Sequence, residues 1–162
     1  MRMPEKCPEC GTVWSDGKTC QDHFHQMLFW EAENPGYGEV HHLMVLCYHL
    51  QHSSLYSLQG LNEGQCLLVE FLEKGVTPDE VRKRNRARVD SSKRKWKIKA
   101  TATSHGSYEH PIRWTMTAAD VVAGGADSYC GNVRRWAQSI LQTLKATGNL
   151  SMGQPLNSAC DS

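Results

Sequence analysis

The sequence predicts a mainly α-helical protein. We expect a bundle of about four longer helices, preceded by a cysteine-rich knuckle and interrupted by a short basic segment in extended or β conformation. Three observations support this fold class. Apolar residues recur at helical spacing over four stretches, capping signals precede several of them, and cysteine and histidine gather near the start. The 162 residues suit one domain with small additions.

The first two helices follow from the turn signals around them. Residues 1–18 contain Cys-Pro, Cys-Gly and Asp-Gly pairs, which favour an irregular start. Either Thr19 or Ser15 is suited to cap a helix over about 20–33, which Asn34-Pro35-Gly36 ends. A second helix is expected at about 39–54. The two apolar stripes are Phe24, Met27 and Leu28, then Val40, Leu43, Cys47 and Leu50.

Terminal signals also mark the later helices. A third helix is expected at about 61–74, with Gly75 at the C-terminal cap. Thr77, Pro78 and Glu80 form a helix start with a capping box, and this helix should end near Val89. Residues 93–114 alternate in places, which predicts short strands or an extended loop. Thr117 and Asp120 repeat the capping signal before a short helix. A last helix follows at about 127–146, and its inward residues are Tyr129, Val133, Trp136, Ile140 and Leu144.

The N-terminal cysteines have the spacing of a metal knuckle. Cys7 and Cys10 form a CxxC pair followed by glycine, a turn that lets two thiolates reach one ion, and Cys20 adds a third soft ligand. Thiolate-rich tetrahedral sites favour Zn²⁺. The sequence therefore predicts a zinc knuckle over 1–19, a helical domain over 20–148 that contains a basic segment at 82–114, and a disordered tail over 149–162.

A structural zinc site requires a fourth ligand, and the candidates are His52, His23 and His49, in that order. If the first two helices form an antiparallel hairpin, paired positions sum to about 72. That sum sets Cys20 opposite His52, and His23 opposite His49. His52 also stands at the end of its helix, where the chain can turn to present the ring.

The motif resembles an uncharacterised family, domain of unknown function 5946. The resemblance covers about residues 7–75 and consists of CPxCG at 7–11, Cys20, and a His-x-Leu-x-Val-x-x-Tyr-x-x-Gln-His stretch at 41–52. Family members usually have proline after Gln-His, where this chain has Ser53. The resemblance implies that Tyr48, Gln51 and His52 belong with the cysteines. Tyr48 and Gln51 are then candidates either to line a pocket beside the metal or to hydrogen-bond its histidine ligand. It implies no activity.

An alternative, catalytic interpretation depends on the remaining histidines and acids. His42 and His49 lie seven residues apart on one helical stripe, and the hairpin sum places Glu31 near His42. Helical bundles build di-metal sites from such inward carboxylates and histidines. The common hydrolase, protease and nucleotide-binding motifs are absent from the sequence. Three thiolates and one histidine would saturate a zinc ion and make it poor at acidifying water, so a closed structural site is preferred to an open catalytic one.

Charge is distributed unevenly along the chain. Residues 82–99 hold ten of the eighteen Lys and Arg and one acid, so this segment carries +9 and the other 144 residues carry −8. Basic residues around an aromatic suit phosphate contact with base stacking. The alternative is a solvated face, or packing on an acidic surface of the same chain or a sister subunit. The candidate polyanion-binding residues are Arg82, Arg84, Arg86, Arg88, Arg94, Lys95, Trp96 and Lys97.

The sequence thus predicts a small zinc-binding helical protein that acts as a binding or accessory module for an anionic partner, with nucleic acid as a candidate. The alternative is a small metal-dependent enzyme that acts on an anionic substrate through a His/Glu site between helices. The longest apolar run, Leu43–Tyr48, is far shorter than the roughly twenty residues of a membrane span, and the start lacks a secretory signal. A cytoplasmic location without membrane contact is expected, and a homodimer through helices is a further expectation.

Overall fold

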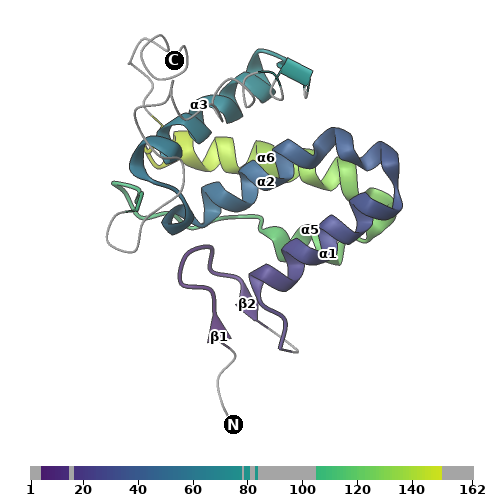
Figure 1. The fold of residues 1–162 in the computed structure, drawn as a ribbon. Helices are drawn as coiled ribbons and strands as arrows, with labels where there is room; N and C mark the ends of the chain where they lie inside the picture. Colours follow the sequence, from purple (N-terminus) through teal and green to yellow (C-terminus); the bar gives the residue numbers. More distant parts are fainter. Residues whose placement is uncertain (1–4, 15–16, 78, 81–82, 84–104, 151–162) are drawn as a thin grey trace.

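The structure, a computed structural model, describes residues 5–14, 17–77, 79–80, 83 and 105–150. It is mainly helical, with a small two-stranded antiparallel sheet near the start of the chain (Figure 1). The elements are β1 (Glu5–Lys6), β2 (Val13–Trp14), α1 (Cys20–Glu33), η1 (Pro35–Val40), α2 (His41–Gln51), η2 (Ser53–Leu55), α3 (Leu58–Glu73), α5 (Ala118–Ala123), η3 (Ala126–Ser128) and α6 (Tyr129–Ala146).

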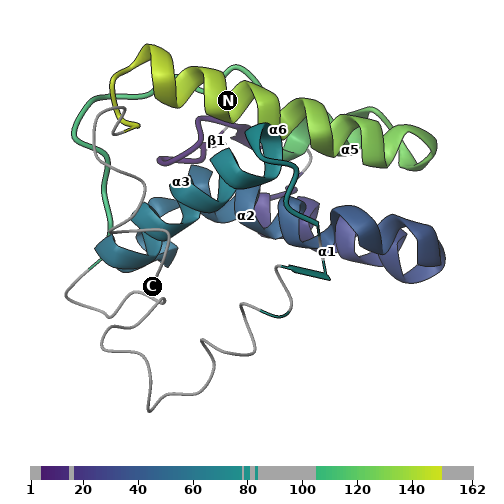
Figure 2. The same cartoon turned by 90° about the horizontal axis from the view of Figure 1, so that it is seen from above.

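The helices form two layers. Seen from above, α5 and α6 lie in one layer, and α1, α2 and α3 lie in the other (Figure 2). The layers meet where α1 packs on α5, and where α2 and α3 pack on α6. In the view of Figure 1 the sheet lies below the ends of α1 and α2, outside both helical layers. The predicted fold class is therefore confirmed.

The apolar core lies between these layers. All five inward residues predicted for the last helix are fully buried, and they are Tyr129, Val133, Trp136, Ile140 and Leu144. Opposite them, Met44 and Leu50 of α2 and Leu61 and Leu68 of α3 are also inaccessible to solvent. Burial of apolar surface on this scale is the main stabilising term in a small helical domain.

Capping interactions begin and end the helices as the sequence predicts. The Thr19 backbone N–H donates to Asp22 Oδ2 at 2.8 Å, and the Asp22 N–H donates to Thr19 Oγ1 at 3.3 Å. The Asp22 carboxylate accepts from the Thr19 backbone N–H and from the Thr19 hydroxyl, and these two bonds hold the pKa of Asp22 below its ordinary value. Thr117 and Asp120 form the same box before α5. Gly75, at φ 65°, ends α3 with a bond from the Val76 N–H to the Glu70 carbonyl.

The second predicted helix is divided into three parts. The structure has η1, then α2, then η2, where the sequence predicted one helix over about 39–54. His52 interrupts the helix because its backbone adopts φ −126° and ψ 66°. This break lets the His52 imidazole turn away from the α2 axis toward the cysteines. The β1–β2 pair was also not predicted, since residues 1–18 were expected to be irregular.

The sequence left two alternatives for the segment before α5, short strands or an extended loop. The described residues of this segment, 105–117, have no strand, which agrees with a loop. The Gly106 N–H donates to the Tyr56 carbonyl at 2.7 Å, and the Tyr108 hydroxyl donates to the Leu50 carbonyl. Residues 93–104 lie outside the described part of the chain. Of the helix predicted from Thr77, the structure describes the start, where the Glu80 N–H donates to Thr77 Oγ1 at 3.3 Å.

Two residues beyond the predicted domain boundary at 148, Asn149 and Leu150, still contact the body of the protein. The Asn149 side chain exchanges two hydrogen bonds with the backbone of His110, and Leu150 packs against the core. The rest of the predicted tail, 151–162, lies outside the described residues. Among the helices that the structure describes, none is long and apolar enough to cross a lipid bilayer.

A buried carboxylate joins α1, α2 and α6. The side chain of Glu31 is only 9% exposed; its Oε1 lies 2.6 Å from His41 Nδ1, and its Oε2 accepts from the Tyr129 hydroxyl. The Tyr129 ring packs edge-on against Trp30, with centroids 5.8 Å apart. Burial and the Glu31 carboxylate raise the pKa of Tyr129 far above its ordinary value, so the phenol stays protonated and donates.

Replacing Tyr129 by Phe should therefore destabilise the protein, because the ring is kept while Glu31 Oε2 loses its donor in a buried position. We expect the free energy of unfolding, measured by urea denaturation, to fall by about 1–3 kcal/mol. Tyr37→Phe is the matched control: its ring also packs on Tyr129, with centroids 5.5 Å apart, and its loss should stay within about 0.5 kcal/mol. Equal effects of the two substitutions would contradict the role given to the Tyr129 hydroxyl.

Candidate metal centre

The β1–β2 hairpin turns the first two cysteines toward each other. Pairing of Lys6 with Val13 leaves Cys7 and Cys10 in the connecting turn, which is closed by a bond from the Cys7 N–H to the Thr12 carbonyl at 2.8 Å. Gly11 adopts φ 80°, a left-handed conformation that costs glycine little. The Cys10 N–H points at Cys7 Sγ at 3.5 Å. The knuckle thus presents two sulfur atoms from one tight turn.

The first residue of α1 supplies the third sulfur. Because Thr19 caps the helix, the position of Cys20 is fixed at its N-terminus. Cys20 Sγ lies 3.5 Å from Cys10 Sγ and accepts a hydrogen bond from Trp14 Nε1 at 3.3 Å. Trp14 belongs to β2, so the hairpin and the helix are already linked through this sulfur.

The break at the end of α2 supplies a nitrogen. His52 Nδ1 lies 2.6 Å from the carbonyl oxygen of Tyr48, which can only accept, so Nδ1 carries the proton. The other ring nitrogen, Nε2, therefore has a free lone pair, and it is buried without a hydrogen-bond partner. The His52 ring also stacks on Tyr48, with centroids 4.3 Å apart. These contacts fix both the tautomer and the orientation of the imidazole.

The four ligand atoms converge. One ligand atom from each of Cys7, Cys10, Cys20 and His52 lies within 4.8 Å of the others, and each residue is about 5% exposed. Tetrahedral zinc binds sulfur at about 2.3 Å and imidazole nitrogen at about 2.0 Å. An ion of this size fits among the four atoms with small side-chain adjustments. The buried lone pair on His52 Nε2, aimed into a group of thiols, is the observation that most directly indicates a cation.

The electrostatics of the cluster also favour a cation. The hydrogen bond with Cys20, together with burial, raises the pKa of Cys10 to about 11, and burial raises the pKa of Cys7. The Cys10–Cys20 hydrogen bond lowers the pKa of Cys20. Burial and the adjacent cysteines raise the pKa of Tyr48 to about 12. Three thiols this close cannot all ionise unless a positive charge compensates them.

The arrangement is chemically closed. Four protein ligands saturate a tetrahedral ion and leave no position for water or substrate, which is the pattern of a structural site. Two further contacts support the cluster from outside. Thr12 Oγ1 lies 3.1 Å from Cys10 Sγ, and Glu9 Oε1 accepts from the Ser54 N–H at 2.9 Å, which ties the knuckle to η2. Sequence spacing gave no indication of either contact.

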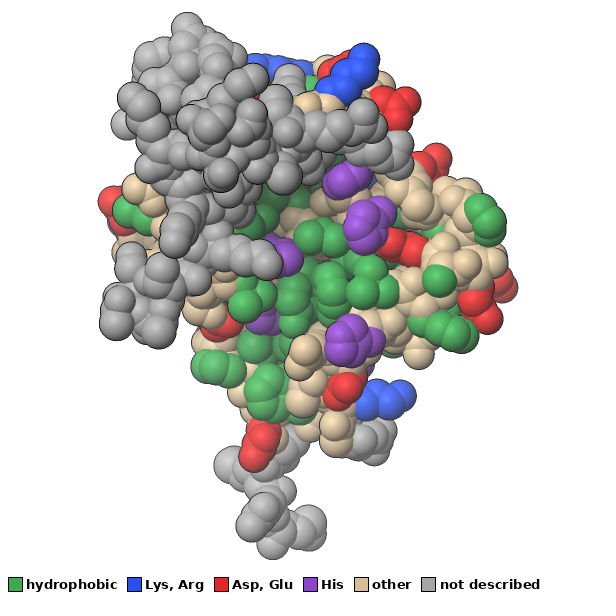
Figure 3. Space-filling model, in the orientation of Figure 1, with side chains coloured by type: hydrophobic (Ala, Val, Ile, Leu, Met, Phe, Trp, Pro, Cys, Tyr) green, Lys and Arg blue, Asp and Glu red, His purple; other side chains and the backbone are tan. Residues whose placement is uncertain are grey.

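Of the three histidines proposed as the fourth ligand, the structure brings His52 to the cysteines. Within the described residues, His23 and His49 do not belong to the cluster. His49 Nδ1 lies 2.8 Å from the Val45 carbonyl, and its ring stacks on Tyr56 with centroids 4.9 Å apart. His23 is half-buried, and burial lowers its pKa. Space-filling shows histidines scattered around an apolar face rather than gathered at one point (Figure 3).

The residues proposed to support the site divide into two groups. Tyr48 contacts His52 directly, as the family resemblance implies. Gln51 is buried and donates from Nε2 to the Met116 carbonyl at 2.7 Å, so it joins α2 to the segment before α5. Glu31 and His42 lie at the other ends of α1 and α2, and the bonded partner of Glu31 is His41, one residue before the predicted one.

The proposed polyanion-binding residues lie outside the described part of the chain. They are Arg82, Arg84, Arg86, Arg88, Arg94, Lys95, Trp96 and Lys97. Their grouping in sequence remains the basis for that prediction. The alternative His/Glu enzyme site likewise stays a prediction.

The comparisons with known proteins extend the resemblance noted from the motif. A family model described as a family of unknown function, DUF5946, matches residues 5–145. The match includes all four residues of the cluster and reaches the end of α6, well beyond the 7–75 of the motif. No curated protein and no solved structure matches the chain.

Zinc uptake by this cluster should be strongly pH-dependent. The raised pKa values of Cys7 and Cys10 keep both thiols protonated at neutral pH, so binding must release at least those two protons. The apparent affinity should therefore fall by about 100-fold when pH is lowered by one unit. Competition with a chelator at a series of pH values between about 6.5 and 8.5 measures this. Uptake that does not vary with pH would contradict thiolate ligation.

Proposed function

The chain belongs to the DUF5946 family of unknown function, and we propose that it is a zinc-binding helical protein that serves as a binding or accessory module for an anionic partner. In this proposal Cys7, Cys10, Cys20 and His52 bind one Zn²⁺. The observation that carries it is His52 Nε2, a buried nitrogen without a hydrogen-bond partner, in a group with three cysteine sulfur atoms.

The donor set favours zinc with a structural role. Three thiolates and one imidazole are soft, tetrahedral ligands that select Zn²⁺ over hard cations such as Mg²⁺ or Ca²⁺. They also donate much electron density to the ion, which makes it a poor acid for activating water. Because all four positions are filled by buried side chains, the ion is proposed to hold the fold together and not to catalyse a reaction.

The proposed ion would attach the β1–β2 hairpin to the helices. The strands β1 and β2 have only two residues each, and so small a hairpin has little stability of its own in water. A zinc ion would join it to the start of α1 and the end of α2 at one point. In small zinc domains such binding contributes about 10–16 kcal/mol at neutral pH, which is ample to order a short hairpin.

The anionic partner is proposed from charge. Residues 82–99 carry +9 within a chain whose net charge is +1, and electrostatic attraction of this kind draws phosphate-rich partners. The chain has no recognition-helix or RNA-binding motif, so contact would be with the backbone of a nucleic acid, without sequence preference. A polyanion is therefore proposed as the partner class, with nucleic acid as the first member to test.

Purified protein should contain about one zinc per chain by elemental analysis. Cys7→Ser should abolish stoichiometric zinc and lower the thermal midpoint of unfolding, because one thiolate of a structural site is lost. Cys47→Ala is the matched control: that thiol is fully buried in the apolar core, so the variant loses stability but keeps its zinc. Equal zinc content in all three proteins would exclude the proposed ligand set.

Binding of the full chain to mixed-sequence DNA and RNA should weaken steeply with salt. For six or more phosphate contacts, affinity should drop by about 10³-fold or more between about 50 and 200 mM salt. Replacing Arg84, Arg86 and Arg88 by Gln should reduce the slope by about three, whereas the same change at the exposed residues Lys18, Lys74 and Arg113 should leave it unchanged. Absence of binding at low salt would reject the polyanion proposal and leave the zinc proposal intact.

A further inference from the structure

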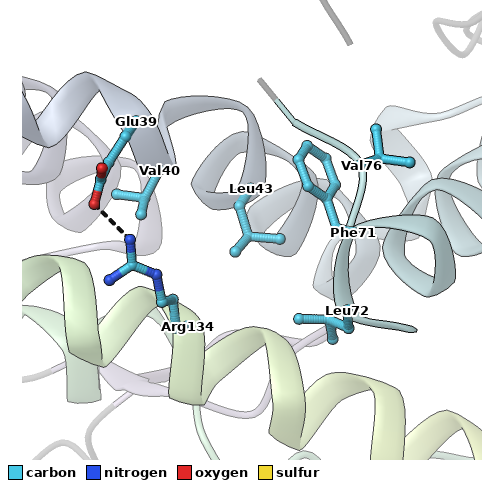
Figure 4. Close-up of a pocket in the computed structure, with 7 residues that line it drawn as sticks. All are labelled: Glu39, Val40, Leu43, Phe71, Leu72, Val76 and Arg134. Atoms are coloured by element: carbon cyan, nitrogen blue, oxygen red, sulfur yellow. Dashed lines mark hydrogen bonds and ion pairs between the residues drawn. The ribbon is translucent and has the colours of Figure 1, made fainter. Parts of the chain in front are cut away.

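A cavity of about 240 Å³ opens on the side of the protein where η1, α2, α3 and α6 meet. It shares no residue with the metal centre, and nothing in the zinc proposal depends on it. Its lining residues are Glu39, Val40, Leu43, Phe71, Leu72, Val76 and Arg134 (Figure 4).

One end of this cavity is ionic. Arg134 Nη2 of α6 lies 2.5 Å from Glu39 Oε1 of η1, and the two side chains are 55% and 56% exposed. An ion pair this exposed has little net stability, because water solvates both charges well when they separate. Separating Glu39 from Arg134 so that each can pair with a charge on a ligand therefore costs little free energy.

The other end of the cavity is apolar. Phe71, Leu72 and Val76 lie opposite the ion pair, and Leu43 lies between the two ends (Figure 4). Val40 and Leu43 are buried and give the cavity a rigid wall on the side of α2. The cavity thus combines an apolar interior with charges at one end, which is the general pattern of a small-molecule site.

We propose that this cavity binds an α-amino acid with an apolar side chain. The Arg134 guanidinium would donate two parallel hydrogen bonds to the ligand carboxylate, and the Glu39 carboxylate would accept from the ligand ammonium group. The apolar side chain would contact Phe71 and Leu72. A cavity of about 150 Å³ lined by aliphatic residues is known to hold a benzene molecule. The present volume therefore suits a branched aliphatic or single aromatic side chain.

The charge balance selects a zwitterion over a simple acid or amine. Glu39 and Arg134 together are neutral, so a ligand with one charge would separate them and leave one protein charge without a partner. A zwitterion compensates both charges and leaves none unpaired. In an α-amino acid the ammonium and the carboxylate are attached to the same carbon atom, so the two ligand charges are close together, as the Glu39 and Arg134 charges are.

A ligand series on the unmodified full-length chain tests this directly by calorimetry and amide NMR titration. L-leucine should bind saturably and shift the resonances of residues that line the cavity. N-acetyl-leucine lacks the ammonium charge, leucine amide lacks the carboxylate, and glycine lacks the apolar side chain; each should bind about tenfold more weakly or worse. No saturable binding of leucine up to about 10 mM would overturn the proposal. So would equal binding of glycine or N-acetyl-leucine.

Variants at the ionic end give a second, independent test. Glu39→Gln and Arg134→Gln should each weaken leucine binding by about tenfold, and both positions are exposed enough to tolerate the change without unfolding. Lys145→Gln is the matched control. Lys145 also forms an exposed ion pair from α6, with Glu73 of α3, but neither residue lines the cavity. Its leucine affinity should match that of the unmodified protein. Weakening by Lys145→Gln equal to that by Arg134→Gln would overturn the assignment.

Discussion

Burying a nitrogen lone pair without a hydrogen-bond partner costs free energy of folding. In this protein the nitrogen is His52 Nε2, and the hairpin and the ends of α1 and α2 surround it. The backbone break after α2 turns His52 inward, and the Tyr48 carbonyl fixes the proton on Nδ1. Nε2 is then left among sulfur atoms from the hairpin and from α1. A cation at this point would satisfy the nitrogen and would permit the thiols to ionise together. A thiol is a weak hydrogen-bond donor and acceptor, so a neighbouring cysteine satisfies this nitrogen less well than a cation would.

The stabilising interactions of the protein are therefore found in two regions, the apolar core between the helical layers and the cluster around the cysteines. The apolar core between the helical layers contains the buried face of α6 and requires nothing from the hairpin. The hairpin and the ends of α1 and α2 are joined instead around the cysteines, by the Trp14–Cys20 and Glu9–Ser54 hydrogen bonds and by a small apolar cluster in which Trp14, Tyr48 and Trp114 pack on the three cysteines. Loss of the proposed ion should therefore release the knuckle first and the layered core later. Local opening of this kind is common where few apolar contacts hold a segment.

Sequence reasoning predicted the cluster because the relevant geometry is local. CxxC spacing, the Thr19 cap and the antiparallel hairpin of α1 and α2 together placed Cys20 opposite His52, and this was confirmed. Contacts between distant segments were not predictable in the same way. The donor to Glu31 is Tyr129, 98 residues away, and the acceptor for Gln51 is Met116, 65 residues away. Periodicity marks which face of a helix is buried; it does not specify which partner meets a polar group there.

We propose that one zinc ion is bound by three sulfur atoms and one imidazole nitrogen. X-ray absorption at the zinc edge, recorded on the intact protein in solution, measures this ligand set. The spectrum should show three sulfur scatterers at about 2.3 Å, one nitrogen at about 2.0 Å with the outer-shell pattern of an imidazole ring, and no oxygen ligand. A spectrum dominated by nitrogen and oxygen, or one with fewer than three sulfur atoms, would contradict it.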